Sequence, residues 1–286
     1  MLKSYKEVII MSKIYCSTGA LVGRVNNNDY SLIIKYLPNL KKKGLIDGAE
    51  FMFAHCFYDK LDDIYNTIYN KGIDFDVIHC DKEIGIMLSE CDVSITEQAL
   101  SLLKINCEFG KKIGAKKGVF HLWGSTKSDS HIEYNISILP RIIEIFNQFE
   151  IMLLIENIPC TCHSCLQNLI EIQKLFPNVN FIFDTRFGAF HDEINATLSS
   201  DMFKKVKHIH ISDYSSFPMD FSKIRPILHP CEGVIDFDKL FNGLKQASYH
   251  ESFTLESPVM SKKGIDIEKL EKSLAYLNEQ VKSHAL

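Results

Sequence analysis

The chain has 286 residues, of which 46% are hydrophobic, and its formal net charge is −4 at pH 7. This length and apolar content suit one large α/β domain with a buried core. The charge argues against a protein held mainly by nucleic-acid phosphates, and the chain lacks an apolar run of the roughly 18 residues that cross a bilayer.

Short apolar segments alternate with amphipathic ones along the whole sequence. The apolar segments predict eight strands, at residues 13–17, 48–53, 75–79, 118–121, 150–155, 180–183, 206–211 and 252–255. Apolar residues spaced three or four apart predict helices at residues 29–43, 61–69, 94–113, 133–149, 166–176, 194–203, 237–246 and 267–281. Pro140 is expected to kink or restart its helix, and residues 80–91 are expected to form a long functional loop.

This strict alternation predicts the fold. Apolar strands without a polar alternate side are typical of a parallel sheet that is covered on both faces. We therefore expect a single-domain (β/α)₈ barrel over residues 1–286, with an open flavodoxin-like sheet as the alternative. Residues 1–12 are expected to be an N-terminal extension that precedes the first strand. The apolar patch at the N-terminus is too short and its surroundings too charged for a secretory signal peptide.

The nine cysteines are an odd number, scattered through a chain large enough to have its own core. Disulfide frameworks belong to small secreted domains, so we expect reduced thiols and a cytoplasmic protein. One cluster stands apart, with Cys160, Cys162, His163 and Cys165 directly after the fifth strand. The spacing of Cys162 and Cys165 suits zinc, but no second pair follows, so packing or loop chemistry is the alternative.

Four of the predicted strands end in metal-type ligands, namely Glu156, Asp184, His210 and Glu256. In a barrel of parallel strands, every strand end points at the same mouth, so these residues should converge. Isolated carboxylates at the ends of buried strands are costly without a cation or donor nearby. The pattern therefore predicts one site for a single divalent ion, either Mn²⁺, Mg²⁺, Zn²⁺ or Fe²⁺.

Other strand ends supply candidates for substrate binding. His79 and His121 are expected to contact the substrate or to support the metal ligands, with simple hydrogen bonding to backbone as the alternative. Trp123 could form a platform for a sugar or could equally pack in the core. Arg225, in the long loop after the seventh strand, is a further substrate-binding candidate. His208 points the same way as His210 and is expected to lie in the core or behind the ligands.

Several motifs resemble those of the xylose isomerase-like barrel superfamily, which includes sugar-phosphate isomerases and epimerases, ketose 3-epimerases, inosose dehydratases and zinc-dependent AP endonucleases. The motifs are Ile155-Glu156-Asn157, Phe183-Asp184-Thr185, His208 to Asp213, Glu232 to Phe237 and Leu255-Glu256-Ser257-Pro258. Their order along the chain makes the resemblance specific. The resemblance implies metal ligation by Glu156, Asp184, His210 and Glu256.

The sequence also departs from the family pattern. Phe187 replaces a frequent histidine after the sixth strand, and Cys231 replaces the first glycine of a Pro-Gly-Glu-Gly loop. Arg225 and Ile227 occupy the two ligand positions of an Asp-x-His motif of AP endonucleases. A trinuclear zinc cluster is therefore not expected, which argues against DNA repair and against a nucleic-acid partner.

The expected function is a metal-dependent isomerase or epimerase of a small sugar or sugar phosphate. Glu156 and Glu256 would transfer protons through a metal-stabilised enediolate. The alternatives are a metal-dependent dehydratase or lyase, an endonuclease IV-like hydrolase, and a non-catalytic barrel that binds a metabolite. The sequence leaves open the identity of the sugar, the metal and the oligomeric state, with a homo-oligomer as one option.

Overall fold

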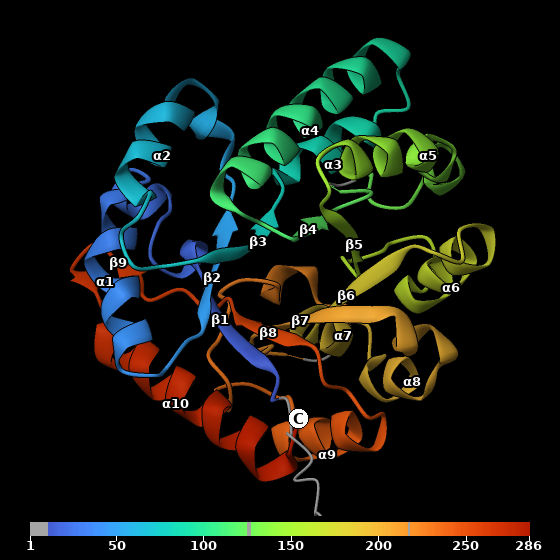
Figure 1. Cartoon of the computed structure of the whole chain (residues 1–286). Helices are drawn as coiled ribbons and strands as arrows, with labels where there is room; N and C mark the ends of the chain where they lie inside the picture. The colour runs from blue at the N-terminus through green and yellow to red at the C-terminus, as the bar shows by residue number, and fades with distance from the viewer. Residues whose placement is uncertain (1–10, 125–126, 217) are drawn as a thin grey trace, which may run out of the picture.

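The structure is a computed structural model that describes residues 11–124, 127–216 and 218–286. Eight parallel strands close into a barrel in which β8 pairs with β1 (Figure 1). The strands are β1 (Lys13–Ser17), β2 (Gly48–Met52), β3 (Phe75–His79), β4 (Lys117–Phe120), β5 (Met152–Glu156), β6 (Asn180–Asp184), β7 (Val206–Ile211) and β8 (Ser252–Leu255). The predicted (β/α)₈ barrel is confirmed, with every strand within two residues of its expected bounds.

Helices surround the barrel (Figure 1). They are α1 (Ser31–Lys42), α2 (Leu61–Ile68), α3 (Lys82–Leu88), α4 (Val93–Ile113), α5 (Ile132–Gln148), α6 (Cys165–Leu175), α7 (Thr185–Phe190), α8 (Ile194–Ser199), α9 (Phe237–Gln246) and α10 (Ile267–His284). A two-stranded antiparallel ribbon, β9 (Met260–Ser261) and β10 (Gly264–Ile265), separates β8 from α10. Among the described residues, no helix is long and apolar enough to cross a membrane.

The helices differ from the prediction in three places. Residues 80–91 contain helix α3 instead of a long loop, because the Asp81 side chain caps that helix by accepting a hydrogen bond from the Glu83 amide. The helix does not restart at Pro140, because the buried face of α5, which includes Leu139 and Ile142, outweighs the lost backbone hydrogen bond; the expected kink stays a prediction. Helix α7 was not predicted, because it is a short helix that begins directly after β6.

The barrel interior has two levels. The lower level, which we call the floor, is a separate buried cluster of Tyr15, Val77, Val119, Leu154 and Ile182. Side chains two residues apart on a strand point to the same face. The side chains one step further toward the carboxyl ends, namely His79, His121, Glu156 and Asp184, therefore form a second inward level. We call this level, together with His210 and Glu256 beside it, the mouth. Residues 1–10 of the expected N-terminal extension lie outside the described residues.

Candidate metal centre

Four side chains from neighbouring strands meet at the mouth. Glu156 and Asp184 end β5 and β6, His210 lies near the end of β7, and Glu256 follows β8. Each offers one ligand atom, and these atoms all lie within 4.8 Å of one another. All four residues are buried, and the most exposed, Glu256, is 6% exposed. The structure therefore brings together the four residues that the sequence proposed as metal ligands, and metal binding itself stays a prediction.

Three carboxylate oxygens of this group have no hydrogen-bond partner among the described residues, namely Glu156 Oε2, Asp184 Oδ2 and Glu256 Oε1. His210 Nδ1 lies between the glutamates, 3.0 Å from Glu156 Oε1 and 3.4 Å from Glu256 Oε1. Each of these oxygens contacts a nitrogen without hydrogen-bond geometry, at 2.5 Å from His121, 3.7 Å from Arg186 and 3.4 Å from His210. Burial has removed their hydration, and no hydrogen bond replaces it. A divalent cation among these oxygens would replace that hydration, so the donor set fits such an ion.

The pKa values reflect this concentration of negative charge. The pKa of Asp184 is raised to about 6, chiefly by burial; the guanidinium of Arg186 opposes the rise, and the charges of Glu156 and Glu256 add to it. Burial alone lowers the pKa of His210, but the neighbouring carboxylates, Glu256 foremost, raise it well above its ordinary value. Protons thus supply the positive charge that a bound cation would supply instead.

Glu156 also belongs to a second group of metal-type ligands, with His79 and His121. Its Oε2 lies 2.5 Å from His121 Nε2 and 3.5 Å from His79 Nε2, and neither nitrogen has a hydrogen-bond partner among the described residues. Burial lowers the pKa of His121 to about 4 despite the opposing charge of Glu156, so this ring is neutral near pH 7. Both histidines proposed to bind substrate therefore adjoin the metal centre, where they can donate to a sugar or hold a second ion.

The other two substrate-binding candidates lie elsewhere. Trp123 is fully buried and belongs to the hydrophobic core, which favours its packing alternative over a sugar platform. Arg225 is exposed on the loop after β7. Its contact with a substrate stays a prediction.

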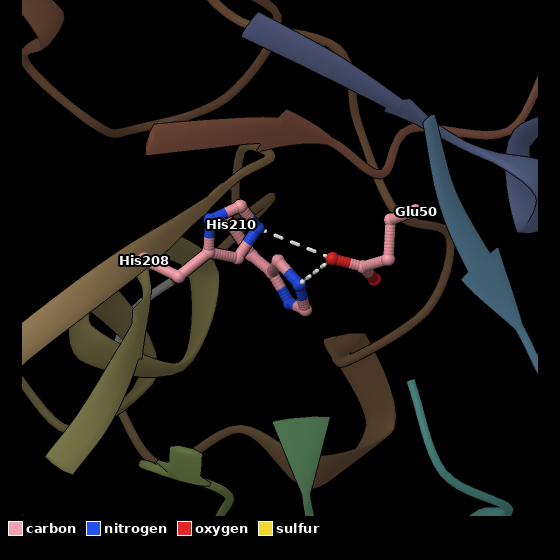
Figure 2. A group of neighbouring side chains, drawn as sticks. All are labelled: Glu50, His208 and His210. Carbon is pink, nitrogen blue, oxygen red and sulfur yellow. Dashed lines mark hydrogen bonds and ion pairs between the residues drawn. The ribbon is translucent and has the colours of Figure 1, made fainter. Parts of the chain in front are cut away.

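Sequence reasoning missed Glu50, a completely buried carboxylate in β2. Figure 2 shows that it points at His208 and His210, and its Oε2 lies 2.9 Å from His210 Nε2 and 3.2 Å from His208 Nε2. His208 also contacts the hydroxyl groups of Ser252 and Thr254, which agrees with the expected core position. The available signal was a charged residue inside the otherwise uncharged strand Gly48–Met52.

Arg186 is a second missed residue. It is 3% exposed, and its Nη2 lies 3.7 Å from Asp184 Oδ2. Its Nη1 donates to the carbonyl of Ile224, in the loop that follows β7. The guanidinium lies over the ring of Phe187, the residue that replaces the frequent family histidine. A buried positive charge thus stands beside the proposed ligand Asp184.

The cysteine cluster after β5 does not come together as a metal site within the part of the chain that the structure describes. Cys160 and Cys165 are buried, whereas Cys162 is exposed. The buried carboxylate of Asp129 instead accepts hydrogen bonds from the backbone amides of Thr161, Cys162 and His163. These contacts favour the packing and loop alternative.

The sequence model of one protein family, described as xylose isomerase-like TIM barrel, matches residues 46–280. No curated protein sequence matches the chain.

Many solved structures share the fold. The crystal structure of IOLI protein with a binding zinc atom is 18% identical, with a TM-score of 0.70 and coverage of 96% of this chain and 98% of that one. D-allulose 3-epimerase from Methylomonas sp. is 12% identical, with a TM-score of 0.69 and coverage of 94% and 97%. 3-keto-D-glucoside 4-epimerase from E. coli is 17% identical, with a TM-score of 0.66 and coverage of 94% and 99%. At these identities the likeness shows the fold alone.

Proposed function

The chain belongs to the family of xylose isomerase-like TIM barrels, and we propose that it is a divalent-metal-dependent isomerase or epimerase of a sugar or sugar phosphate. The observation that carries the proposal is the buried group of Glu156, Asp184, His210 and Glu256, three of whose carboxylate oxygens have no partner among the described residues. Structural neighbours of this chain include two sugar epimerases, which supports an enzyme of this kind.

These four residues would hold one ion, either Mn²⁺, Mg²⁺, Zn²⁺ or Fe²⁺. When bound, such an ion polarises the carbonyl of a hydroxy-ketone and stabilises the negative charge that develops when the adjacent carbon loses a proton. His210 Nδ1 faces the two glutamates, and Asp184 Oδ1 is held by the Phe187 amide at 3.0 Å. The chain thus fixes the orientation of two of the four ligands before anything binds.

Glu156 and Glu256 are the proposed proton-transfer groups. They come from the ends of β5 and β8, three strands apart, and both approach His210 Nδ1. We propose that a sugar bound between them presents opposite faces to the two carboxylates. One would remove the proton from the carbon beside the carbonyl, and the other would return it. Their burial excludes water, which strengthens each charge interaction with the substrate.

The histidines beside Glu156 are the proposed substrate contacts. His121 is 10% exposed in its side chain and neutral, so it can donate a hydrogen bond to a sugar hydroxyl. His79 is fully buried, and its Nδ1 is engaged by the carbonyl of Cys80 at 2.8 Å, which aims its Nε2 at Glu156. Arg225 is proposed to contact the substrate from the loop after β7.

Solvent exchange tests the proposed function. Ketoses and ketose phosphates are incubated with the protein and each of the four metals in deuterated water, and deuterium is measured at the carbon beside the carbonyl. We expect metal-dependent exchange with at least one ketose, and none after treatment with a chelator. A metal-loaded protein that exchanges no proton with any of them would favour the dehydratase or metabolite-binding alternatives.

A metal-dependent hydrolase or lyase is the second candidate, favoured by the group of His79, His121 and Glu156. The two oxygens of Glu156 face different groups, Oε1 toward His210 and Oε2 toward His121, as in a carboxylate that bridges two ions. Two neighbouring ions suit hydrolysis of phosphate esters. Metal analysis separates the candidates, because the isomerase proposal expects one ion per chain and the hydrolase two.

A further inference from the structure

We infer that Glu50 is a positioning residue for His210, the single imidazole of the proposed metal centre, and that it holds the proton of this ring on Nε2. The inference rests on the proposed function, because it assigns a role toward the same ion. Glu50 reaches His210 from β2, across the barrel from β7, and both residues are completely buried (Figure 2).

The two ring nitrogens of His210 face different carboxylates. His210 Nε2 lies 2.9 Å from Glu50 Oε2, whereas Nδ1 lies 3.0 Å from Glu156 Oε1. An imidazole that donates from one nitrogen presents the lone pair of the other. With Glu50 as the acceptor at Nε2, the lone pair of Nδ1 is turned toward Glu156, Glu256 and Asp184, where the ion is proposed to bind.

A chain of hydrogen bonds holds Glu50 in turn. Lys117 Nζ donates to Ser252 Oγ at 3.0 Å, and Ser252 Oγ lies 2.7 Å from His208 Nδ1. When the hydroxyl of Ser252 donates to that nitrogen, the proton of His208 lies on Nε2, which is 2.8 Å from Thr254 Oγ1 and 3.2 Å from Glu50 Oε2. Thr254 Oγ1 donates to the same oxygen at 3.1 Å.

Glu50, His208 and His210 also lie close enough to hold an ion themselves. Their ring nitrogens, however, all have hydrogen-bond partners, since His208 contacts Ser252 and Thr254 and His210 contacts both Glu50 and Glu156. Glu50 Oε1 has no hydrogen-bond partner among the described residues, but three such oxygens lie on the other side of His210, at Glu156, Asp184 and Glu256. These contacts favour a role for Glu50 as a hydrogen-bond partner of His210, with the proposed ion bound at Nδ1 of the same ring.

Two variants at one position separate charge from hydrogen bonding. Glu50→Gln keeps an oxygen that can accept from His210 but removes the negative charge, and Glu50→Leu removes both. We expect the Kd for Mn²⁺ or Zn²⁺, measured by calorimetry, to rise about 10-fold in the first and about 100-fold in the second. Asp129→Asn is the matched control, because Asp129 is an equally buried acceptor of several N–H groups outside the metal centre. It should lower stability and leave the metal Kd unchanged.

Nuclear magnetic resonance of the wild-type protein loaded with Zn²⁺ provides a readout that needs no variant. The ¹⁵N shifts of His210 should show a proton on Nε2 and the ion on Nδ1. The opposite assignment, or a Kd for Glu50→Gln and Glu50→Leu equal to that of the wild type, overturns the role of Glu50 while the metal centre stands. A wild-type protein that binds none of the four proposed ions overturns the proposed function together with this inference.

Discussion

The floor and the mouth of the barrel interior differ in whether their buried polar atoms have hydrogen-bond partners within the chain. At the floor, Val77, Val119, Leu154 and Ile182 pack with Tyr15, and the hydroxyl of Tyr15 donates to Asp76 at 2.7 Å. One step along the same strands, the interior holds carboxylates and imidazoles. Several of their atoms have no hydrogen-bond partner among the described residues. The chain completes the floor with its own atoms, whereas at the mouth several buried polar atoms are left without hydrogen bonds, and we propose that a ligand contacts them.

The energetic cost of buried polar atoms supports this difference between the floor and the mouth. Each buried polar atom that lacks a partner costs about 1–3 kcal/mol relative to its hydrated state. Such a cost persists in a protein chiefly where a function requires it. The mouth combines at least three such carboxylate oxygens with nearly complete burial, which is the condition that a bound cation relieves.

The largest expected effect belongs to the floor. Leu154→Ala should lower the free energy of unfolding by about 2–5 kcal/mol, because it leaves a cavity among residues that cannot collapse inward. Denaturation in urea measures this loss, and calorimetry should find the metal Kd unchanged. Loss of metal binding in a folded Leu154→Ala variant would show that floor and mouth do not act separately.

The next effect belongs to the mouth. Glu156→Gln and Glu256→Gln each keep an oxygen for the metal but remove a basic carboxylate. Each should lower turnover about 10²-fold or more, which corresponds to about 2.7 kcal/mol, while some metal is retained. Glu97→Gln, an exposed carboxylate on α4 that pairs with Arg141, is the control and should keep full turnover. Full turnover in both the Glu156→Gln and the Glu256→Gln variant would show that these glutamates do not transfer the protons.

The third effect depends on pH. Because the pKa of Asp184 is raised to about 6 in the folded protein, chiefly by burial, the metal-free protein binds this proton more tightly than the unfolded chain does. Protonated Asp184 therefore contributes to the free energy of unfolding of the metal-free protein. This contribution is complete below about pH 4 and is lost as the pH rises through 6. The raised pKa of His210 has an effect of the same sign: its contribution to stability is lost as the pH rises above the ordinary pKa of histidine.

Metal binding should reverse this trend, because the ion replaces the protons. At a metal concentration of about ten times the Kd near pH 7, the ion should add about 1.4 kcal/mol to the free energy of unfolding. The increase in Tm on adding metal should vanish toward pH 4. An increase that is the same at pH 4 and pH 7 would place the ion away from these ligands.

The smallest effect is expected at the edge of the floor. Lys13 pairs with Asp76 at 2.9 Å, but its side chain is 61% exposed. Lys13→Met should change the free energy of unfolding by less than about 1 kcal/mol, and added salt should reduce the difference. A larger loss in urea denaturation would mean that the floor also depends on charged pairs.

The alternation of apolar and amphipathic segments was enough to predict the barrel. Continuous apolar runs indicate strands that are buried on both faces, and a period of about 3.6 residues indicates the helices that cover them. The convergence of Glu156, Asp184, His210 and Glu256 could also be predicted, because the carboxyl ends of all strands in a parallel barrel lie at the same mouth.

The supporting residues could not be predicted in this way. Glu50 lies inside β2, at a register shift between Ala49 and Glu50. Because it does not end its strand, a search for polar residues at strand ends does not find it. Arg186 lies in a short helix that begins when the Asp184 side chain accepts a hydrogen bond from the Phe187 amide. Its contact with Ile224 joins residues 38 positions apart, which no local pattern indicates.

The central claim is that the mouth binds a divalent cation through Glu156, Asp184, His210 and Glu256. Anomalous scattering from crystals grown with Mn²⁺ or Zn²⁺ tests it most directly, because it locates the ion and identifies the element. The account predicts a peak at the mouth, with ligand distances of about 2.0–2.4 Å to one atom of each residue and with the His210 bond made by Nδ1. A metal-saturated crystal without a peak there, or with these four side chains more than about 8 Å apart, would contradict it.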